Sequence, residues 1–240
     1  MQKLEQKLHN IDLFLDCADL SLIRKFKEDP RVKGFTTNPT LMRASNILNY
    51  RNFAETASKY VYPLPISFEV LSDDFAEMQR QALALQSIAP NIYVKIPITN
   101  TKKESSLSLI KELQDKQVNL NITAVMTNEQ VENIFTNLNF TSNTYISIFA
   151  GRISDTGINP INLISKSILL GKKFKNLKIL WASPRHLYNL IEAEMCGCHV
   201  ITMTAELWEK MHLLGKSLEE FSLETVKMFF NDAVSAKLSI

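Results

Sequence analysis

The sequence predicts an α/β fold, a (β/α)8 TIM barrel with an additional C-terminal helix, and three observations lead to it. Eight short runs of β-branched and aliphatic residues recur along the chain, with helical periodicity between them. The runs are continuously apolar, as strands covered by helices are. Residues 1–240 are 45% hydrophobic without a linker, which suits one domain. An open doubly wound sheet shows the same alternation, so periodicity alone leaves that fold open.

The eight runs have the length of ordinary strands. They are residues 11–16, 34–37, 65–70, 92–98, 118–124, 144–149, 178–182 and 199–202. A helix is expected at residues 73–89, with Ser72 or Asp73 as its N-cap, because apolar side chains there keep helical spacing. Similar patterns predict helices at residues 104–116, 128–138, 160–172 and 184–196, the last three with Asn128, Asn159 and Ser183 as candidate N-caps.

Residues 216–238 follow the eighth run and a short predicted helix at 205–213, and they have no strand to cover. Apolar residues form a helical stripe in this segment: Leu218, Phe221, Val226, Phe229, Phe230 and Ala233. An apolar face of this size is normally buried against other parts of a protein. The spacing favours two arrangements equally: a helix that caps its own barrel, or an arm that packs on a neighbouring subunit.

Charge and composition exclude several classes of protein. The 27 Lys and Arg residues nearly balance 25 Asp and Glu residues, so neither nucleic acid nor an anionic membrane is an expected partner. Charged residues interrupt the first ten positions, and no segment is long and apolar enough to span a bilayer, so a cytoplasmic location is expected. Three cysteines are too few for a disulfide framework, and the six glycines form no nucleotide-binding fingerprint.

Polar residues gather where the predicted strands end. In a barrel of this kind the C-terminal strand ends meet at one face, which is where catalytic groups lie. Each residue alone is more often a cap or turn former, but their convergence predicts a site. The residues are Asp16, Asn38, Glu69, Lys95, Asn121, Thr123, Ser147, Arg152, Ser183 and Arg185.

Lys95 is the most informative of these positions because it lies inside an apolar strand, where a charged ammonium is costly to desolvate. An edge strand with Lys95 in solvent would be a purely structural explanation, and Pro97 favours it. Nucleophilic catalysis by an amine instead requires a buried lysine that can attack a carbonyl and form a Schiff base. Glu69 and Asp16 could then move protons, and the two arginines suit a phosphate.

At these residues the sequence resembles the transaldolase family, over nearly the whole chain. Seven motifs occur in the family's order: LFLDCAD at 13–19, GFTTNPTL at 34–41, ISFEV at 66–70, VKIPIT at 94–99, NIT at 121–123, SIFAGR at 147–152 and ASPR at 182–185. The length is similar to that of the short subfamily, which also contains fructose-6-phosphate aldolases. Members of that subfamily form pentameric rings, often paired into decamers, so the resemblance implies a homo-oligomer.

The resemblance implies a class I aldolase barrel that transfers a dihydroxyacetone unit from a ketose phosphate to an aldose phosphate, with sugar phosphates as partners and no cofactor. Lys95 would form the Schiff base, and Asp16 would be the acid and base of carbon–carbon cleavage. Glu69 and Thr123 would hold the catalytic water. The implied substrate-binding residues are Asn38, Asn121, Ser147, Phe149, Arg152, Ser183 and Arg185.

Two positions bear on the choice between transfer and simple cleavage. The aldolases of the subfamily carry Gln at the position of Glu69 and Tyr at that of Phe149, so both residues favour a transaldolase. Ile148, Ala150 and Pro184 depart from the family pattern near the phosphate end, which leaves a specialised enzyme for an unusual sugar phosphate open. A fructose-6-phosphate-aldolase-like lyase and a catalytically silent barrel that binds sugar phosphate are competing hypotheses.

The cluster formed by Cys196, Cys198 and His199 resembles a metal site, but its ligands are spaced too closely. We therefore expect buried thiols there and no metal.

Overall fold

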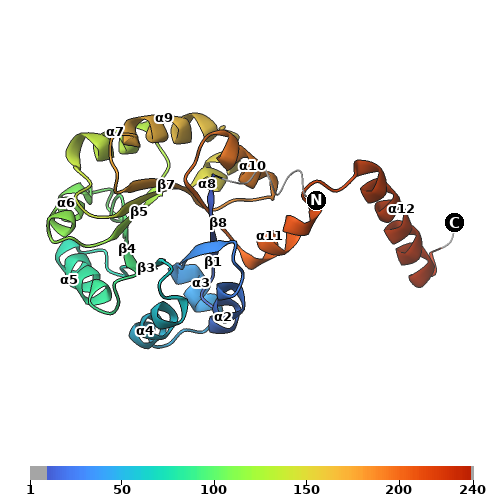
Figure 1. Ribbon diagram of the computed structural model, residues 1–240, viewed down its shortest axis with the longest axis horizontal. Coiled ribbons are helices and arrows are strands. Elements are labelled where there is room, and N and C mark those ends of the chain that lie inside the picture. Colours follow the sequence, from blue (N-terminus) through green and yellow to red (C-terminus); the bar gives the residue numbers. More distant parts are fainter. Residues whose placement is uncertain (1–9, 239–240) are drawn as a thin grey trace. The chain divides into compact units, whose positions relative to one another are not determined.

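The structure is a computed structural model that describes residues 10–238 of the chain. The chain divides into two units, of which one holds residues 10–208 and the other includes the described residues from Glu209 onward. The first unit is a closed barrel of eight parallel strands in sequence order, which confirms the predicted fold and excludes the open sheet. Figure 1 shows the helices outside the ring of strands.

The strands are close to the predicted runs. They are β1 (Asp12–Asp16), β2 (Val32–Thr36), β3 (Ile66–Glu69), β4 (Ile92–Pro97), β5 (Leu120–Val125), β6 (Thr144–Ile148), β7 (Leu177–Trp181) and β8 (Val200–Met203). β2 begins two residues before the predicted run, because Val32 pairs with Leu13 of β1 while Lys33 lies exposed. Within residues 10–238 the closed barrel leaves no edge strand, so Pro97 marks the end of an interior strand.

Helices connect the strands on the outside. They are α2 (Leu20–Lys27), α3 (Pro39–Ala44), α4 (Tyr50–Val61), α5 (Phe75–Gln86), α6 (Leu107–Asp115), α7 (Asn128–Asn137), α8 (Ala150–Asp155), α9 (Ile161–Gly171), α10 (Tyr188–Met195) and α11 (Ala205–Glu209). The sequence patterns above give no range for α2, α3, α4 or α8. Asp19 accepts hydrogen bonds from the amides of Ser21 and Leu22, so a polar cap is enough to begin α2.

Several predicted N-caps are wrong. α5 is capped by Asp74, whose side chain accepts from the Glu77 amide, because Asp73 instead accepts from Thr101. Thr127, rather than Asn128, caps α7.

The predicted helix at 184–196 also begins late, at Tyr188. Ser183 has a left-handed backbone with φ of +59° and does not cap the helix. The side-chain Oδ1 of Asn159 does accept a hydrogen bond from the backbone amide of Ile161 at the start of α9, although Pro160 occupies the N-cap position.

Side chains on alternate strand positions fill the barrel interior, because successive residues of a strand face opposite sides. Phe14 packs edge-to-face on Tyr145 with ring centroids 5.6 Å apart, and Leu180 and Val200 join this cluster. Gly34 leaves room for it, since a Cβ there would lie 2.5 Å from the Phe14 ring. The apolar layer occupies the interior and leaves the C-terminal strand ends to polar groups.

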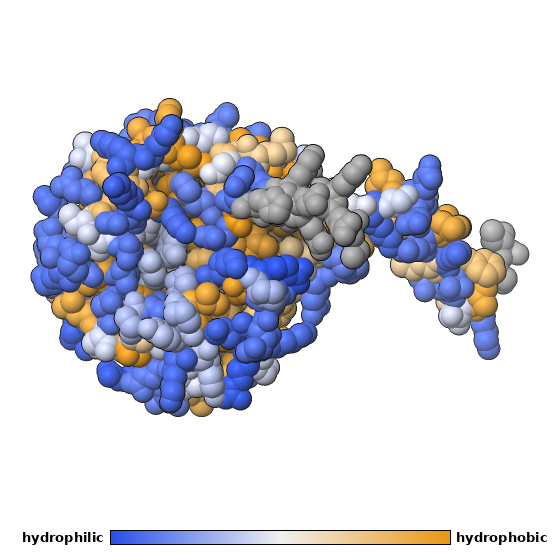
Figure 2. Space-filling model, in the orientation of Figure 1, coloured by the Kyte–Doolittle hydropathy of each residue, from blue (hydrophilic) through white to orange (hydrophobic). Residues whose placement is uncertain are grey.

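The second unit contains a short 3-10 helix, Lys210–Leu213, and α12 (Leu218–Ser235), which accounts for the predicted C-terminal helix. α12 buries none of its residues, and apolar side chains lie exposed along it, including Phe229 at 63% and Phe230 at 67% (Figure 2). The expectation about the first ten residues falls almost wholly on residues 1–9, which lie outside the described residues. Within residues 10–238 no helix is both long and apolar enough to cross a bilayer.

Candidate active site

The predicted residues meet in one cavity at the C-terminal ends of the strands. The cavity measures about 480 Å³ and is lined by every predicted site residue except Asn121. Those lining residues are Asp16, Asn38, Glu69, Lys95, Thr123, Ser147, Phe149, Arg152, Ser183 and Arg185. They come from β1, β3, β4, β5, β6 and the connections after β2, β6 and β7, so closure of the barrel brings them together.

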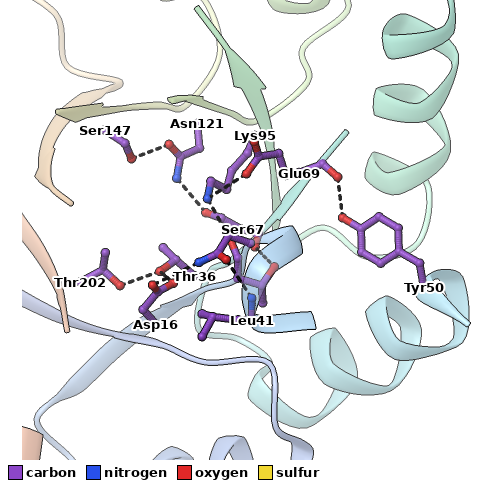
Figure 3. Close-up of polar contacts among 12 residues, drawn as sticks. Asp16, Thr36, Leu41, Tyr50, Ser67, Glu69, Lys95, Asn121, Ser147 and Thr202 are labelled. Carbon is purple, nitrogen blue, oxygen red and sulfur yellow. Dashed lines mark hydrogen bonds and ion pairs between the residues drawn. The ribbon is translucent and has the colours of Figure 1, made fainter. Parts of the chain in front are cut away.

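Lys95 lies buried in the wall of this cavity. Its Nζ lies 3.2 Å from Oε2 of Glu69 and donates a hydrogen bond of 2.8 Å to the carbonyl oxygen of Thr37 (Figure 3). Lys95 and Glu69 are direct partners across β3 and β4, which is why the two side chains meet. The hypothesis of a solvated lysine is wrong, since only 7% of its side chain is exposed. The pairing offsets the cost of burying a charge.

Asp16 holds a second carboxyl group in the same cavity. Its Oδ1 accepts a hydrogen bond of 2.7 Å from Thr36, and its Oδ2 lies 3.4 Å from the amide nitrogen of Asn38. Burial raises the pKa of Asp16, and the Lys95 ammonium and the Thr36 hydrogen bond act in the opposite direction. The carboxylate of Glu69 adds to the rise. A carboxylate with a raised pKa is a stronger base than an ordinary one, and it can return the proton that it accepts.

Asn38 and Tyr50 fix the polypeptide around these carboxyl groups. The Asn38 side chain caps α3 by accepting the Leu41 amide at 3.0 Å, which holds its Nδ2 toward Asp16. Tyr50, the first residue of α4, donates its hydroxyl to the carbonyl oxygen of Glu69 at 2.7 Å. Both hydrogen bonds tie the outer helices to the strand ends that carry the site.

Asn121 lies behind the cavity wall. It is fully buried, its Nδ2 donates to Ser67 at 3.1 Å, and its Oδ1 accepts from the Ser147 hydroxyl at 2.6 Å. Ser147 does line the cavity. The geometry therefore makes Asn121 a support for Ser147, and a direct contact of Asn121 with substrate stays a prediction.

Thr123 presents a buried polar atom that has no partner among the described residues. This atom is its hydroxyl oxygen, Oγ1. The pairing of β5 with β6 is irregular between Ile122 and Val125, and Ala124 there has a left-handed φ of +61°. Because buried hydroxyl groups nearly always have a partner, Thr123 marks a place for a water molecule or a substrate atom.

Two arginines stand at one side of the cavity. The Arg152 guanidinium lies 5.8 Å from the centre of the Phe149 ring, and Arg185 forms an ion pair with Asp155 at the end of α8. Ser183 lines the cavity with them. The guanidinium groups of the two arginines favour an anionic group such as a phosphate on this side of the cavity.

Sequence reasoning missed four threonines of the cavity wall and the serine behind it: Thr36, Thr40, Thr202, Thr204 and Ser67. The signal was present, because Thr36 lies two residues before Asn38 and Ser67 two residues before Glu69. Alternate positions of a strand share one face, so counting back in twos from the predicted residues would have found Thr36 and Ser67. β8 had no candidate because its one polar residue is Thr202, and threonine is common in strands.

The cysteine and histidine cluster lies outside this cavity. Cys196 and Cys198 are free thiols, and of the two only Cys198 is fully buried. Among residues 10–238 the structure contains no group of three or more His, Cys, Asp or Glu side chains that could hold a metal ion.

Comparison with known proteins places this chain in a family. Residues 13–240 match the family described as Transaldolase/Fructose-6-phosphate aldolase. A probable transaldolase of Nitrosopumilus maritimus is 34% identical over 215 residues, covering 87% of this chain and 92% of that protein. A probable transaldolase of Geobacillus kaustophilus is 32% identical over 212 residues, covering 88% and 94%.

Solved structures support the fold. The 3-hexulose-6-phosphate synthase from Salmonella typhimurium superposes with a TM-score of 0.57 at 11% identity, covering 83% of this chain and 91% of that one. KGPDC from Streptococcus mutans gives 0.56 at 9% identity, covering 84% and 91%. At these identities the likeness concerns the barrel alone.

The fold and its lysine-centred cavity define an enzyme of the TIM-barrel class. More particularly, the chain belongs to the transaldolase/fructose-6-phosphate aldolase family.

Proposed function

We propose that this protein is a transaldolase that moves a dihydroxyacetone unit from a ketose phosphate, of the fructose 6-phosphate or sedoheptulose 7-phosphate type, to an aldose phosphate. The observation that carries the proposal is the buried Lys95 amine, 3.2 Å from the Glu69 carboxylate and open to the cavity. A lysine in this setting is suited to forming a Schiff base with a ketone.

Imine formation begins when the Lys95 ammonium passes a proton to Glu69 and the neutral amine attacks the C2 carbonyl of the donor. Through a water molecule held with Thr123, Glu69 is placed to move a proton from the attached nitrogen to the carbonyl oxygen. It then gives up the proton that it took from Lys95, and this oxygen leaves as water. The product is a protonated imine, which attracts electrons from the neighbouring carbon–carbon bond. The enzyme therefore needs no organic cofactor for this step.

Cleavage then requires a base at the C4 hydroxyl. Asp16 removes that proton, the bond between C3 and C4 breaks, and its electron pair enters the imine to give an enamine. The aldehyde fragment leaves. The enamine attacks the carbonyl of the acceptor aldose phosphate, Asp16 returns the proton to the new hydroxyl, and hydrolysis of the imine frees the product and Lys95. The raised pKa of Asp16 suits both directions of proton transfer.

The phosphate group is assigned to the rim formed by Arg152, Ser183 and Arg185. These residues follow β6 and β7, whereas Lys95 lies on β4, so the rim and the lysine are at different places around the barrel. This separation supports an extended substrate, with its carbonyl at the lysine and its phosphate at the rim. The remaining substrate hydroxyls face Asn38 and Ser147, which supply donors and acceptors along the wall.

Reductive trapping tests the lysine. We expect borohydride added with fructose 6-phosphate to leave a stable mass increment, located at Lys95 by peptide mapping. Lys95→Ala abolishes the adduct and turnover, whereas Lys178→Ala, which removes a lysine paired with Asp12 in the same barrel, retains both. No adduct with any ketose phosphate overturns the proposal and favours a barrel that only binds sugar phosphate.

A lyase is the second candidate, and it differs in the fate of the enamine. The acidic Glu69 and the apolar Phe149 favour transfer, by resemblance to transaldolases. We expect turnover of fructose 6-phosphate to depend on an added aldose phosphate. Release of free dihydroxyacetone without an acceptor would establish the lyase instead.

We also propose a homo-oligomer, a pentamer or decamer, in which α12 packs on a neighbouring subunit. Support comes from the family resemblance and from the apolar residues exposed along α12, such as Phe229 and Phe230. We expect light scattering to give the mass of the assembly, and replacement of both phenylalanines by glutamate to reduce it. A wild-type monomer at micromolar concentration would refute the assembly.

A further inference from the structure

Asp16 lies on β1 between two strands that each carry a threonine toward it. β1 pairs with β2 on one side and with β8 on the other. The hydroxyl oxygens of Thr36 and Thr202 are 2.6 Å apart, and the Thr36 hydroxyl lies 2.7 Å from Oδ1 of Asp16 (Figure 3). Both threonines are buried, with 3% and 4% exposure. The three side chains form a continuous chain of hydrogen bonds across three strands.

The chemistry of the three groups gives this chain a direction. An ionised carboxylate can only accept hydrogen bonds, whereas a hydroxyl donates one hydrogen and accepts others. While Asp16 is ionised, the one hydroxyl hydrogen of Thr36 therefore goes to Asp16. The contact between the two threonines then requires Thr202 to donate to Thr36.

We propose that Thr202 is a positioning residue for the reaction: by donating to Thr36 it holds the Thr36 hydroxyl hydrogen on Asp16 and stabilises the ionised carboxylate that accepts the substrate proton. This inference rests on the proposed function, in which Asp16 moves that proton. Nothing in the family match assigns a role to Thr202.

Removal of the Thr202 hydroxyl has a defined effect. Valine has nearly the same shape as threonine but cannot donate, so the Thr36 hydroxyl keeps Asp16 as its acceptor but loses the donor that holds and polarises it. The ionised form of Asp16 then loses stabilisation. A hydroxyl that accepts one hydrogen bond donates a stronger one, and the gain is largest when the acceptor is charged. The Thr202 hydroxyl therefore affects Asp16 through Thr36, although Thr202 and Asp16 form no hydrogen bond with each other.

The other charged groups that face Asp16 remain in place in such a variant. They are the Lys95 ammonium on β4 and the Glu69 carboxylate on β3, and the Cys17 thiol adjoins Asp16 in the chain. Arg152 and Arg185 line the same cavity. None of these side chains has a hydrogen bond to Thr202 among those that the structure gives, so a change in the pH profile reports the lost hydroxyl.

The test compares three variants of the full chain. Thr202→Val removes the donor, and Thr202→Ser restores it. Thr144→Val is a matched control, because Thr144 is also a buried strand threonine, 2% exposed, and its hydroxyl bonds to Ser142 and Gln114 at the opposite end of the barrel. The readouts are kcat and KM with fructose 6-phosphate and an aldose phosphate, the pH dependence of kcat/KM, and borohydride trapping.

We expect Thr202→Val to lower kcat about three- to tenfold, the effect of one hydrogen bond. The acidic limb of its kcat/KM profile shifts to higher pH, since protonated Asp16 cannot act as the base. KM stays near the wild-type value, Lys95 is still trapped, Thr202→Ser recovers the wild-type profile, and Thr144→Val retains wild-type kinetics.

Two outcomes overturn the inference: a Thr202→Val enzyme with the wild-type profile, or equal losses in Thr202→Val and Thr144→Val, which would mean a general structural effect. Failure of the proposed function gives a different result: the wild-type protein itself then shows no borohydride adduct on Lys95, whatever the threonine variants do.

Discussion

Gly151 in α8 lies against the backbone of the connection that carries Ser183 and Arg185. A Cβ built at Gly151 would lie 1.6 Å from the carbonyl oxygen of Ser183, whereas ordinary contact begins at 3.4 Å. In Gly151→Ala the connection therefore has to withdraw by about 1.8 Å, the difference between these two distances. Since the obstacle is backbone rather than a flexible side chain, rotamer changes cannot relieve it.

The free energy of unfolding follows from two opposing effects. Overpacking of a dense interior costs about 1–3 kcal/mol, and a clash with backbone belongs at the upper end. Alanine is favoured over glycine inside a helix by about 1 kcal/mol. We expect Gly151→Ala to lose about 2 kcal/mol in urea unfolding, or about 4–8 °C in Tm for a chain of this size.

The same displacement acts on the proposed phosphate rim. The withdrawn connection carries Ser183 and Arg185 away from the phosphate, so KM for a phosphorylated donor rises, while borohydride trapping of dihydroxyacetone on the lysine persists. Gly157→Ala is the control for KM, because Gly157 has a φ of +81°, which strains alanine, but nothing within 4 Å of an added Cβ. A wild-type KM together with wild-type stability in Gly151→Ala would refute the close approach of α8 to Ser183.

Three further predictions concern the cavity. Burial raises the pKa of Asp16, so the folded state loses stability as the pH rises from the ordinary value of 3.8 toward the raised one, where only the unfolded chain has released this proton. In urea titrations the stability of Asp16→Asn relative to the wild type should therefore increase as the pH rises above about 4, while turnover is lost. A difference that does not change with pH would contradict this. Ala124 has a left-handed φ of +61°, which costs an alanine about 1–2 kcal/mol. Glycine avoids this cost but loses more backbone entropy on folding, so Ala124→Gly should gain up to about 1 kcal/mol in the free energy of urea unfolding. A loss of stability would contradict this. Arg185→Lys keeps the positive charge but loses the planar guanidinium group that pairs with Asp155. KM should therefore rise for phosphorylated donors and stay unchanged for dihydroxyacetone. Equal effects on both donors would place the phosphate elsewhere.

The barrel could be predicted from the sequence because its signal is local and repeated. Each apolar run marks a strand wherever it occurs, and eight runs with helical stretches between them favour one topology. Lys95 stood out for the same reason, since a charge within an apolar strand is visible without knowledge of any neighbour. The short helices were harder. α8 has only six residues, and its first residues follow directly on a strand, so it lacks the length over which periodicity is detectable.

The tertiary structure alone decided which side chains meet. Lys95 and Glu69 are 26 positions apart in the sequence and become neighbours only through the register of β3 with β4. Thr202 reaches Thr36 across 166 positions because the barrel closes between β8 and β1. Asn121 can be recognised in the sequence as a polar residue within an apolar strand, but its burial between Ser67 and Ser147 depends on the register of β3, β5 and β6. Local composition thus determined the elements and the kinds of chemistry available, whereas distances, burial and the direction of each hydrogen bond depend on long-range pairing that no local pattern encodes.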